Sequence, residues 1–228
     1  MTKWLASVQS VDEANSVLPI LPDILDMKNP SLGALGALPV VTVSKIVELI
    51  NGQCQTSATI GDLEMNARII GPAMIAMAAS GVDYVKMGLF PDEHLSQCLV
   101  DISASVKGLD TPVIAVIFAD QPVNGEIHAL LAQSGFKGVM IDTALKDGKR
   151  LLDHMNEAEL AEFVAAAKKH NLLCGLAGAL RNEDIPVLAA LDADYLGFRS
   201  ALCEQRQRKA TLNIANVAAI KVAMAQIS

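Results

Sequence analysis

Acidic and basic side chains follow several short apolar runs of the chain. Asp26 and Lys28 close one run, Lys86 lies near the end of another, and Asp142 and Lys146 come directly after a third. A lysine amine can attack a carbonyl to form a Schiff base, or, when it is neutral, it can remove a proton from carbon. Two lysines in one partly desolvated site repel each other, which favours the neutral amine. These residues therefore predict Schiff-base formation or proton abstraction.

The spacing of these residues predicts that they face one interior. Asp26 and Lys28 are two positions apart, and such side chains face the same side of a strand. Lys86 follows the apolar Tyr84 and Val85 and is expected to point inward as well. For any single lysine, an exposed ammonium paired with an aspartate is an equally good interpretation. The recurrence of lysines and aspartates after successive runs favours a reactive site.

The elements that position these residues repeat as a short apolar run followed by an amphipathic segment. Runs of four to six apolar residues are typical of strands buried on both faces of a parallel sheet. Eight runs predict strands, at 5–8, 24–27, 56–60, 84–87, 113–118, 138–141, 172–176 and 195–198. The segments between and after them predict helices at 11–18, 43–50, 68–80, 93–106, 125–134, 157–170, 183–191 and 212–227.

Eight strand–helix units in 228 residues leave about 28 residues for each unit. This predicts an α/β fold, a single-domain (β/α)8 TIM barrel over residues 1–228. The rival is an open doubly wound sheet, which normally has a glycine-rich turn after its first strand. Here the first predicted strand is followed by Gln9 and Ser10. In a barrel, chemistry belongs at the carboxyl ends of the strands, where the lysines and aspartates lie.

Small residues after the last two predicted strands indicate a phosphate site. The loops after strands seven and eight of such barrels often hold a phosphate with backbone N–H groups. Gly178 and Ala179 follow the seventh strand, and Arg199 and Ser200 follow the eighth. Tight packing is the alternative explanation for the small residues. The position of both segments at these two strands favours phosphate binding.

The composition argues against several classes of protein. The chain has 18 Lys and Arg against 25 Asp and Glu, and a formal charge of −7 argues against nucleic acid as a partner. No run approaches the roughly 20 apolar residues of a membrane-spanning helix. Asp12 and Glu13 come too early in the chain for a signal peptide. The four cysteines are scattered and the histidines lack ligand spacing, so we expect reduced thiols, a cytoplasmic location and no metal.

Five segments resemble one enzyme family, in order and at the family's spacing. The most specific reads Asp-Thr-Ala-x-Lys-Asp-Gly-Lys at 142–149, and the others lie at 26–30, 57–62, 83–88 and 176–180. On these segments the chain resembles the (5-formylfuran-3-yl)methyl phosphate synthases, also called 4-(hydroxymethyl)-2-furaldehyde phosphate synthases. The resemblance extends over nearly the whole chain.

The resemblance implies a lyase of the aldolase type. The family condenses two molecules of glyceraldehyde 3-phosphate to a furan aldehyde phosphate, losing one phosphate and water, for the biosynthesis of methanofuran or methylofuran. Its Schiff-base lysine corresponds to Lys28 and its proton acceptor to Lys86. Asp26, Asp142 and Lys146 match further active-site positions, and Asp26 is expected to position Lys28. We expect no cofactor, a triose phosphate as the substrate, and assembly into a homo-oligomer.

Condensation of two triose phosphates requires two anion sites. The second is expected near the loop 33–37, which contains Gly33 and Gly36. Here and at the first site the chain departs from the family's usual residues, at Leu32, Ala34, Leu38, Ala179 and Ser200. The missing hydroxyls at 34 and 179 remove side-chain contacts to phosphate, whereas the backbone N–H groups remain.

Two other functions remain open from the sequence. Barrel decarboxylases and hexulose-phosphate synthases use Asp-x-Lys-x-x-Asp, which Asp26 and Lys28 begin, but Ser31 stands where the second Asp belongs. A non-catalytic barrel that senses a phosphorylated metabolite would need a phosphate site but no paired lysines. Release of phosphate from glyceraldehyde 3-phosphate, together with a furan chromophore, distinguishes the synthase from both.

Overall fold

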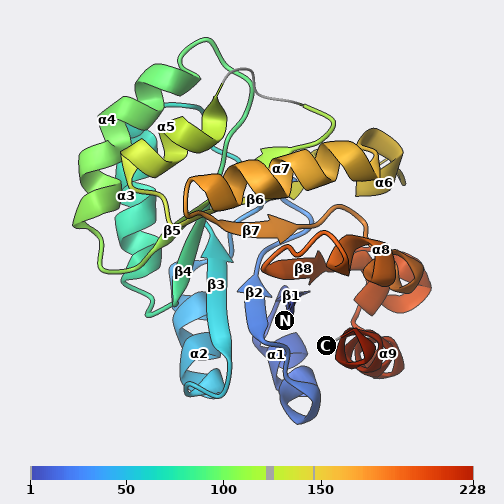
Figure 1. Cartoon of the computed structure of the whole chain (residues 1–228). Coiled ribbons are helices and arrows are strands. Elements are labelled where there is room, and N and C mark those ends of the chain that lie inside the picture. The colour runs from blue at the N-terminus through green and yellow to red at the C-terminus, as the bar shows by residue number, and fades with distance from the viewer. Residues whose placement is uncertain (1, 122–125, 146, 228) are drawn as a thin grey trace.

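A closed barrel of eight parallel strands forms the centre of the molecule. The computed structural model describes residues 2–121, 126–145 and 147–227. Each strand pairs with the next in the sequence, and β8 closes the barrel against β1 (Figure 1). The predicted fold is confirmed, and the strand bounds differ from prediction by at most two residues: β1 (Lys3–Val8), β2 (Ile24–Met27), β3 (Gln55–Thr59), β4 (Tyr84–Gly88), β5 (Val113–Phe118), β6 (Gly138–Asp142), β7 (Leu173–Leu176) and β8 (Tyr195–Phe198).

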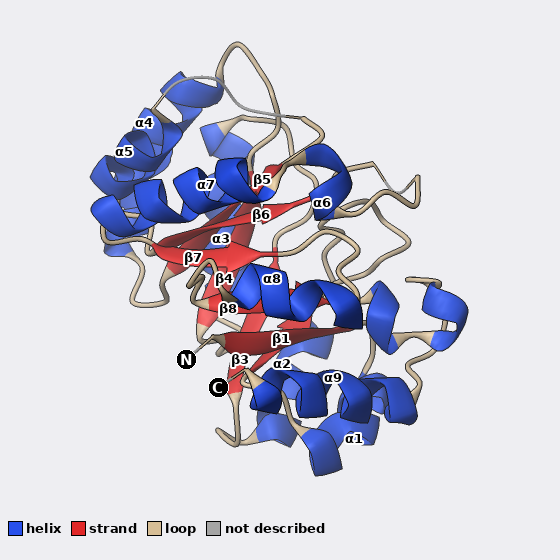
Figure 2. Cartoon of the chain, turned by 45° about the vertical axis from the view of Figure 1, so that its right-hand side comes forward, coloured by secondary structure: helices blue, strands red, loops and turns tan. Residues whose placement is uncertain are grey.

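Helices cover the outside of the barrel (Figure 2). Their bounds are α1 (Val11–Val17), α2 (Val40–Ile50), α3 (Ala67–Ala78), α4 (Leu95–Gly108), α5 (Ile127–Ser134), α6 (Leu151–His154), α7 (Glu157–Lys169), α8 (Ile185–Ala189) and α9 (Ile214–Gln226). The short α6 was not predicted, because a single turn leaves no periodic pattern. Asn156 caps α7, with its side chain accepting the backbone N–H of Glu159.

Polar side chains on the neighbouring strands β1, β2 and β3 interrupt the apolar interior of the barrel. All six residues of β5 are buried, as the apolar run predicts. In contrast, the strand register sets Ser7 of β1 beside Asp26 of β2, and Asp26 beside Ser57 of β3. All three side chains are buried. A carboxylate flanked by two hydroxyls thus lies inside the barrel.

A repeated contact joins strands at the amino-terminal end of the barrel. Asp23, Asp83 and Asp194 stand directly before β2, β4 and β8. Each carboxylate accepts the backbone N–H at the start of the preceding strand, at Trp4, Thr56 and Cys174 with distances of 2.9, 2.7 and 2.7 Å. These bonds fix strand pairs at the end of the barrel opposite the expected chemistry.

The structure also shows the burial of the four cysteines and the lengths of the helices. Cys98, Cys174 and Cys203 are buried, Cys54 is half-buried, and none of the four forms a disulfide in the described part of the chain. Within the described part of the chain, no helix combines the length and the apolar content needed to cross a membrane.

Candidate active site

A cavity of about 800 Å³ opens at the carboxyl end of the barrel. It brings together side chains that are far apart in the sequence, among them Lys28, Lys86 and Asp142. Lys28 is 7% exposed and Lys86 only 2%. Both lysines are therefore interior groups that reach a common cavity, as the spacing predicts.

Asp26 is the most enclosed charged group of the site. Its Oδ1 accepts hydrogen bonds from Lys86 Nζ at 2.9 Å and Ser57 Oγ at 2.7 Å, and its Oδ2 accepts one from Ser7 Oγ at 2.9 Å. Burial alone raises the pKa of Asp26, but the charges of Lys86 and Lys28 and the hydrogen bonds outweigh it, so the pKa lies below its ordinary value. Asp26 is therefore a carboxylate at neutral pH.

Each catalytic lysine candidate faces a carboxylate. Asp26 forms an ion pair with Lys86, whereas the sequence analysis expects it to position Lys28. Lys28 Nζ lies 3.7 Å from Asp142 Oδ2 at the end of β6. The pairing differs from the expectation because β2 and β4 are separated only by β3, so the long side chain of Lys86 reaches across to Asp26. The predicted site residue Lys146 lies outside the described residues.

The loop after β2 already holds a carboxylate. The backbone N–H groups of Ala34 and Leu35 both donate to Asp62, at 2.8 Å. Gly33 has a φ of +117°, and a Cβ there would lie 2.0 Å from the Asp62 carboxylate. Gly33 lines the cavity, whereas Gly36 is not among its lining residues. This loop therefore does not form the open set of donors expected for a second anion.

The other predicted phosphate segment lies at the cavity wall. Gly178, Ala179, Arg199 and Ser200 all line the cavity. Gly178 and Ala179 have φ values of +117° and +49°, which turn the backbone sharply after β7. The structure thus brings the two segments together, as predicted.

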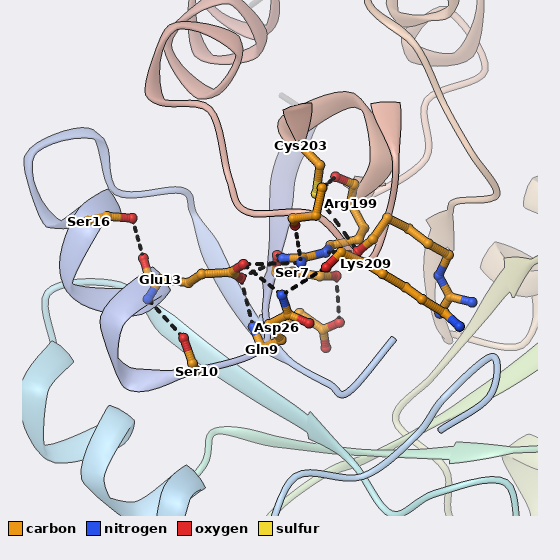
Figure 3. Close-up of polar contacts among 11 residues, drawn as sticks. Ser7, Gln9, Ser10, Glu13, Ser16, Asp26, Arg199, Cys203 and Lys209 are labelled. Atoms are coloured by element: carbon orange, nitrogen blue, oxygen red, sulfur yellow. Dashed lines mark hydrogen bonds and ion pairs between the residues drawn. The ribbon is translucent and has the colours of Figure 1, made fainter. Parts of the chain in front are cut away.

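The side chain of Arg199 is committed elsewhere. Its guanidinium donates to both carboxylate oxygens of Glu13 in α1, at 2.6 and 3.2 Å, and to the backbone oxygen of Ser7 (Figure 3). Both partners are buried. Arg199 is consequently a link between β8, β1 and α1, and only its backbone remains for a phosphate.

The loop between β8 and α9 adds cations that sequence reasoning missed. Arg206, Arg208 and Lys209 all line the cavity. Arg208 also donates a 2.9 Å hydrogen bond to the backbone oxygen of Gly33, so the loop reaches across to the loop after β2. Burial lowers the pKa of Arg208, an effect that Asp142 opposes. The sequence signal for this loop was the presence of four cationic residues within 199–209. It was missed because only the residues directly after the predicted strand were considered as site residues.

The cavity is cationic although the chain is acidic. Its described lining has two carboxylates, Asp62 and Asp142, against eight basic residues: Lys28, Lys86, Lys149, Arg181, Arg199, Arg206, Arg208 and Lys209. Lys86 and Arg199 pair with the buried carboxylates of Asp26 and Glu13, and the other six still outnumber the acids of the lining. The chain as a whole has a charge of −7. Such a local excess of donors suits a small anionic substrate. The described residues contain no group of three or more His, Cys, Asp or Glu placed to hold a metal ion.

Comparison with known proteins decides the family. A model of the 4-HFC-P synthase family matches residues 4–221. The chain belongs to the 4-HFC-P synthase family. It is therefore an enzyme, and the resemblance inferred from its motifs is confirmed.

Individual members of the 4-HFC-P synthase family align over most of the chain. A (5-formylfuran-3-yl)methyl phosphate synthase of Methanopyrus kandleri is 37% identical over 73% of this chain and 74% of its own. The synthase of the same name from Methanocaldococcus jannaschii is 35% identical over 73% and 75%. A Methylorubrum extorquens protein that bears this name provisionally is 43% identical over 96% and 90%.

Solved structures confirm the TIM-barrel fold and show nothing beyond it. A phosphoribosyl anthranilate isomerase from Thermus thermophilus superposes with a TM-score of 0.68 at 12% identity, covering 100% of both chains. A 3-hexulose-6-phosphate synthase gives a TM-score of 0.62 at 15% identity, covering 98% of this chain and 100% of the other. At such identities the activities of these neighbours do not transfer to this chain.

Proposed function

We propose that this member of the 4-HFC-P synthase family condenses two molecules of glyceraldehyde 3-phosphate to (5-formylfuran-3-yl)methyl phosphate, with loss of one phosphate and water. The observation that supports this most strongly is the pair of buried lysines, Lys28 and Lys86, that share one cation-rich cavity and each face an aspartate. Class I aldolase chemistry needs one amine that becomes covalently bound and a separate group that moves a proton.

Lys28 is the covalent residue in this proposal. Its amine attacks the carbonyl of one triose phosphate, water leaves, and an iminium forms. The iminium withdraws electrons from the neighbouring carbon and makes the hydrogen on that carbon acidic. Asp142, 3.7 Å from the amine, is placed to hold Lys28 in position and to balance the positive charge of the iminium.

Lys86 is the proton acceptor. The ammonium that pairs with Asp26 first gives one proton to water. The neutral amine then takes the proton next to the iminium, and the resulting enamine attacks the aldehyde of the second triose phosphate. Elimination of phosphate, ring closure and dehydration complete the product. Asp26 holds the Lys86 amine at 2.9 Å and is itself fixed by two serine hydroxyls, so it acts as a positioning residue for the base.

Two anion sites serve the two substrates. We place one phosphate on the backbone of Gly178, Ala179 and the residues 199–200 after β8. We place the second beside Arg208, because Asp62 already uses the N–H donors of the loop after β2. The excess of basic residues around this cavity supports both assignments. We expect Lys146 to act on the second triose or on the leaving phosphate, and the homo-oligomeric, cytoplasmic state remains a prediction.

The proposal is tested by adding glyceraldehyde 3-phosphate to the purified protein. Inorganic phosphate and a furan product, followed by its ultraviolet absorbance, should appear together, with one phosphate released for each furan formed. Phosphate release without the chromophore would indicate a different reaction. Binding of the substrate without either signal would favour a phosphometabolite sensor and would contradict the proposed synthase.

A further inference from the structure

A second cavity lies inside the barrel, below the active-site cavity. It has a volume of about 150 Å³ and is lined by residues at the amino-terminal ends of the strands. Its outer end is bordered by Lys3, which is exposed, and by Gln55, Tyr84 and Leu173, which are half-buried. This lower cavity therefore extends from the amino-terminal face of the barrel into its interior.

The group around Asp26 separates the two cavities. Ser7 lines the upper cavity and Ser57 lines the lower one, and both hydroxyls donate to the Asp26 carboxylate between them. Lys86 lines both cavities. The side chain that carries the proposed base thus borders a second space besides the cavity in which we place the substrate.

The lower cavity is suited to water. Its volume has room for about five water molecules at roughly 30 Å³ each, and water occupies cavities whose walls offer polar partners. Gln55 donates to the Tyr84 hydroxyl at 3.2 Å and accepts from Lys3 Nζ at 3.1 Å. These three polar side chains line the cavity toward the amino-terminal face of the barrel. Ser57 and Lys86 supply polar groups at the inner end.

We propose that the lower cavity is the route by which the proton taken up by Lys86 exchanges with solvent while substrate fills the upper cavity. The inference rests on the proposed function. When the substrate carbon gives its proton to the Lys86 amine, the electron pair of the C–H bond enters the enamine. Lys86, now an ammonium, passes one proton to water in the lower cavity. That water delivers it to bulk solvent, and Lys86 returns to the neutral amine.

The test measures deuterium uptake by substrate in D₂O. In D₂O the Lys86 amine carries two deuterons before substrate binds. It therefore returns a mixture of hydrogen and deuterium to the enamine when it keeps the abstracted proton, and only deuterium when it has exchanged that proton. The recovered glyceraldehyde 3-phosphate is labelled at the carbon next to its carbonyl. Mass spectrometry gives this wash-in relative to phosphate release. Leu173→Trp places a large ring at the outer end of the lower cavity, whereas Leu173→Met keeps the side-chain volume. Leu173 does not line the upper cavity.

The expected result is a ratio of wash-in to phosphate release that is lower by about one third or more for Leu173→Trp, because one of the three hydrons on an unexchanged ammonium is the abstracted proton, and an unchanged ratio for Leu173→Met. Ser57→Ala and Ser7→Ala form a second pair, in which each variant loses one hydroxyl donor to Asp26. Only Ser57→Ala should lower the ratio. An unchanged ratio in both Leu173→Trp and Ser57→Ala, or no wash-in by the parent enzyme, would overturn the inference. Absence of furan product and phosphate from the parent enzyme would instead contradict the proposed function.

Discussion

The amine of Lys86 donates a 2.9 Å hydrogen bond to a carboxylate oxygen of Asp26, and both side chains are buried inside the barrel. The same oxygen accepts a hydrogen bond from Ser57, and the other oxygen accepts one from Ser7. A buried carboxylate costs several kcal/mol unless charge and hydrogen bonds compensate it. Asp26 therefore fixes the position of Lys86 and depends on Lys86 for its own stability.

Asp26→Asn should reduce both stability and turnover. The substitution leaves a buried amine without its carboxylate, and breaking such a pair costs about 3–5 kcal/mol of unfolding free energy. The matched variant Ser57→Ala removes one hydroxyl donor and should cost about 1 kcal/mol. Urea unfolding followed by circular dichroism measures both. Equal losses in the two variants would contradict the importance of the ion pair.

The stability of the protein should fall in acid because of Asp26. Its folded-state pKa lies below the ordinary value of 3.8, so the carboxylate contributes stability that is fully present above that value. The contribution is lost as the pH falls through the folded-state pKa. The unfolding free energy of the parent protein should therefore decrease more steeply below about pH 4 than that of Asp26→Asn. Parallel pH curves for the two proteins would show that Asp26 is not the responsible group.

Arg208→Met should weaken substrate binding. A hydrogen bond to a charged group contributes about 1.5–3 kcal/mol, so the KM for glyceraldehyde 3-phosphate should rise about tenfold to a hundredfold. Arg208→Lys keeps the positive charge but loses the guanidinium group, which also donates to Gly33. Its KM should lie between those of the parent enzyme and Arg208→Met. Arg68→Met, at an exposed position of α3, is the control. A KM unchanged by Arg208→Met would remove Arg208 from the anion site.

Lys86→Arg should separate proton transfer from covalent binding. Loss of a general base lowers turnover by about 10²–10⁴-fold, and a guanidinium is effectively never deprotonated. The Schiff base on Lys28 should still form and be trapped by borohydride. Lys45→Arg, an exposed lysine of α2, should retain turnover. Full activity of Lys86→Arg would assign the proton transfer to another group.

The sequence predicted the fold and the lysines because both depend on local patterns. Eight apolar runs predict the barrel strands, and the two-residue spacing of Asp26 and Lys28 predicts a shared interior. The partner of each lysine could not be predicted in this way. Lys86 bonds Asp26 across an intervening strand, and the register that places Ser57 next to Asp26 follows from barrel closure.

Contacts between loops were the other part beyond sequence reasoning. Arg208 bonds Gly33 across 175 positions of the chain, and Asp62 takes the N–H donors of Ala34 and Leu35. Both contacts depend on the packing of neighbouring loops at the open end of the barrel, and the periodicity of apolar residues does not predict such packing. The phosphate prediction for Arg199 concerned its backbone, which lies at the cavity wall, and the pairing of its side chain with Glu13 in α1 was not predicted.

Borohydride trapping on Lys28 tests the central claim most directly. Reduction of the protein in the presence of glyceraldehyde 3-phosphate should add the substrate mass to the peptide that contains Lys28, and peptide mass spectrometry locates it. Lys28→Arg should abolish both trapping and turnover, because a guanidinium does not form the iminium. Substrate mass on Lys86 or Lys146, together with an active Lys28→Arg variant, would contradict the account.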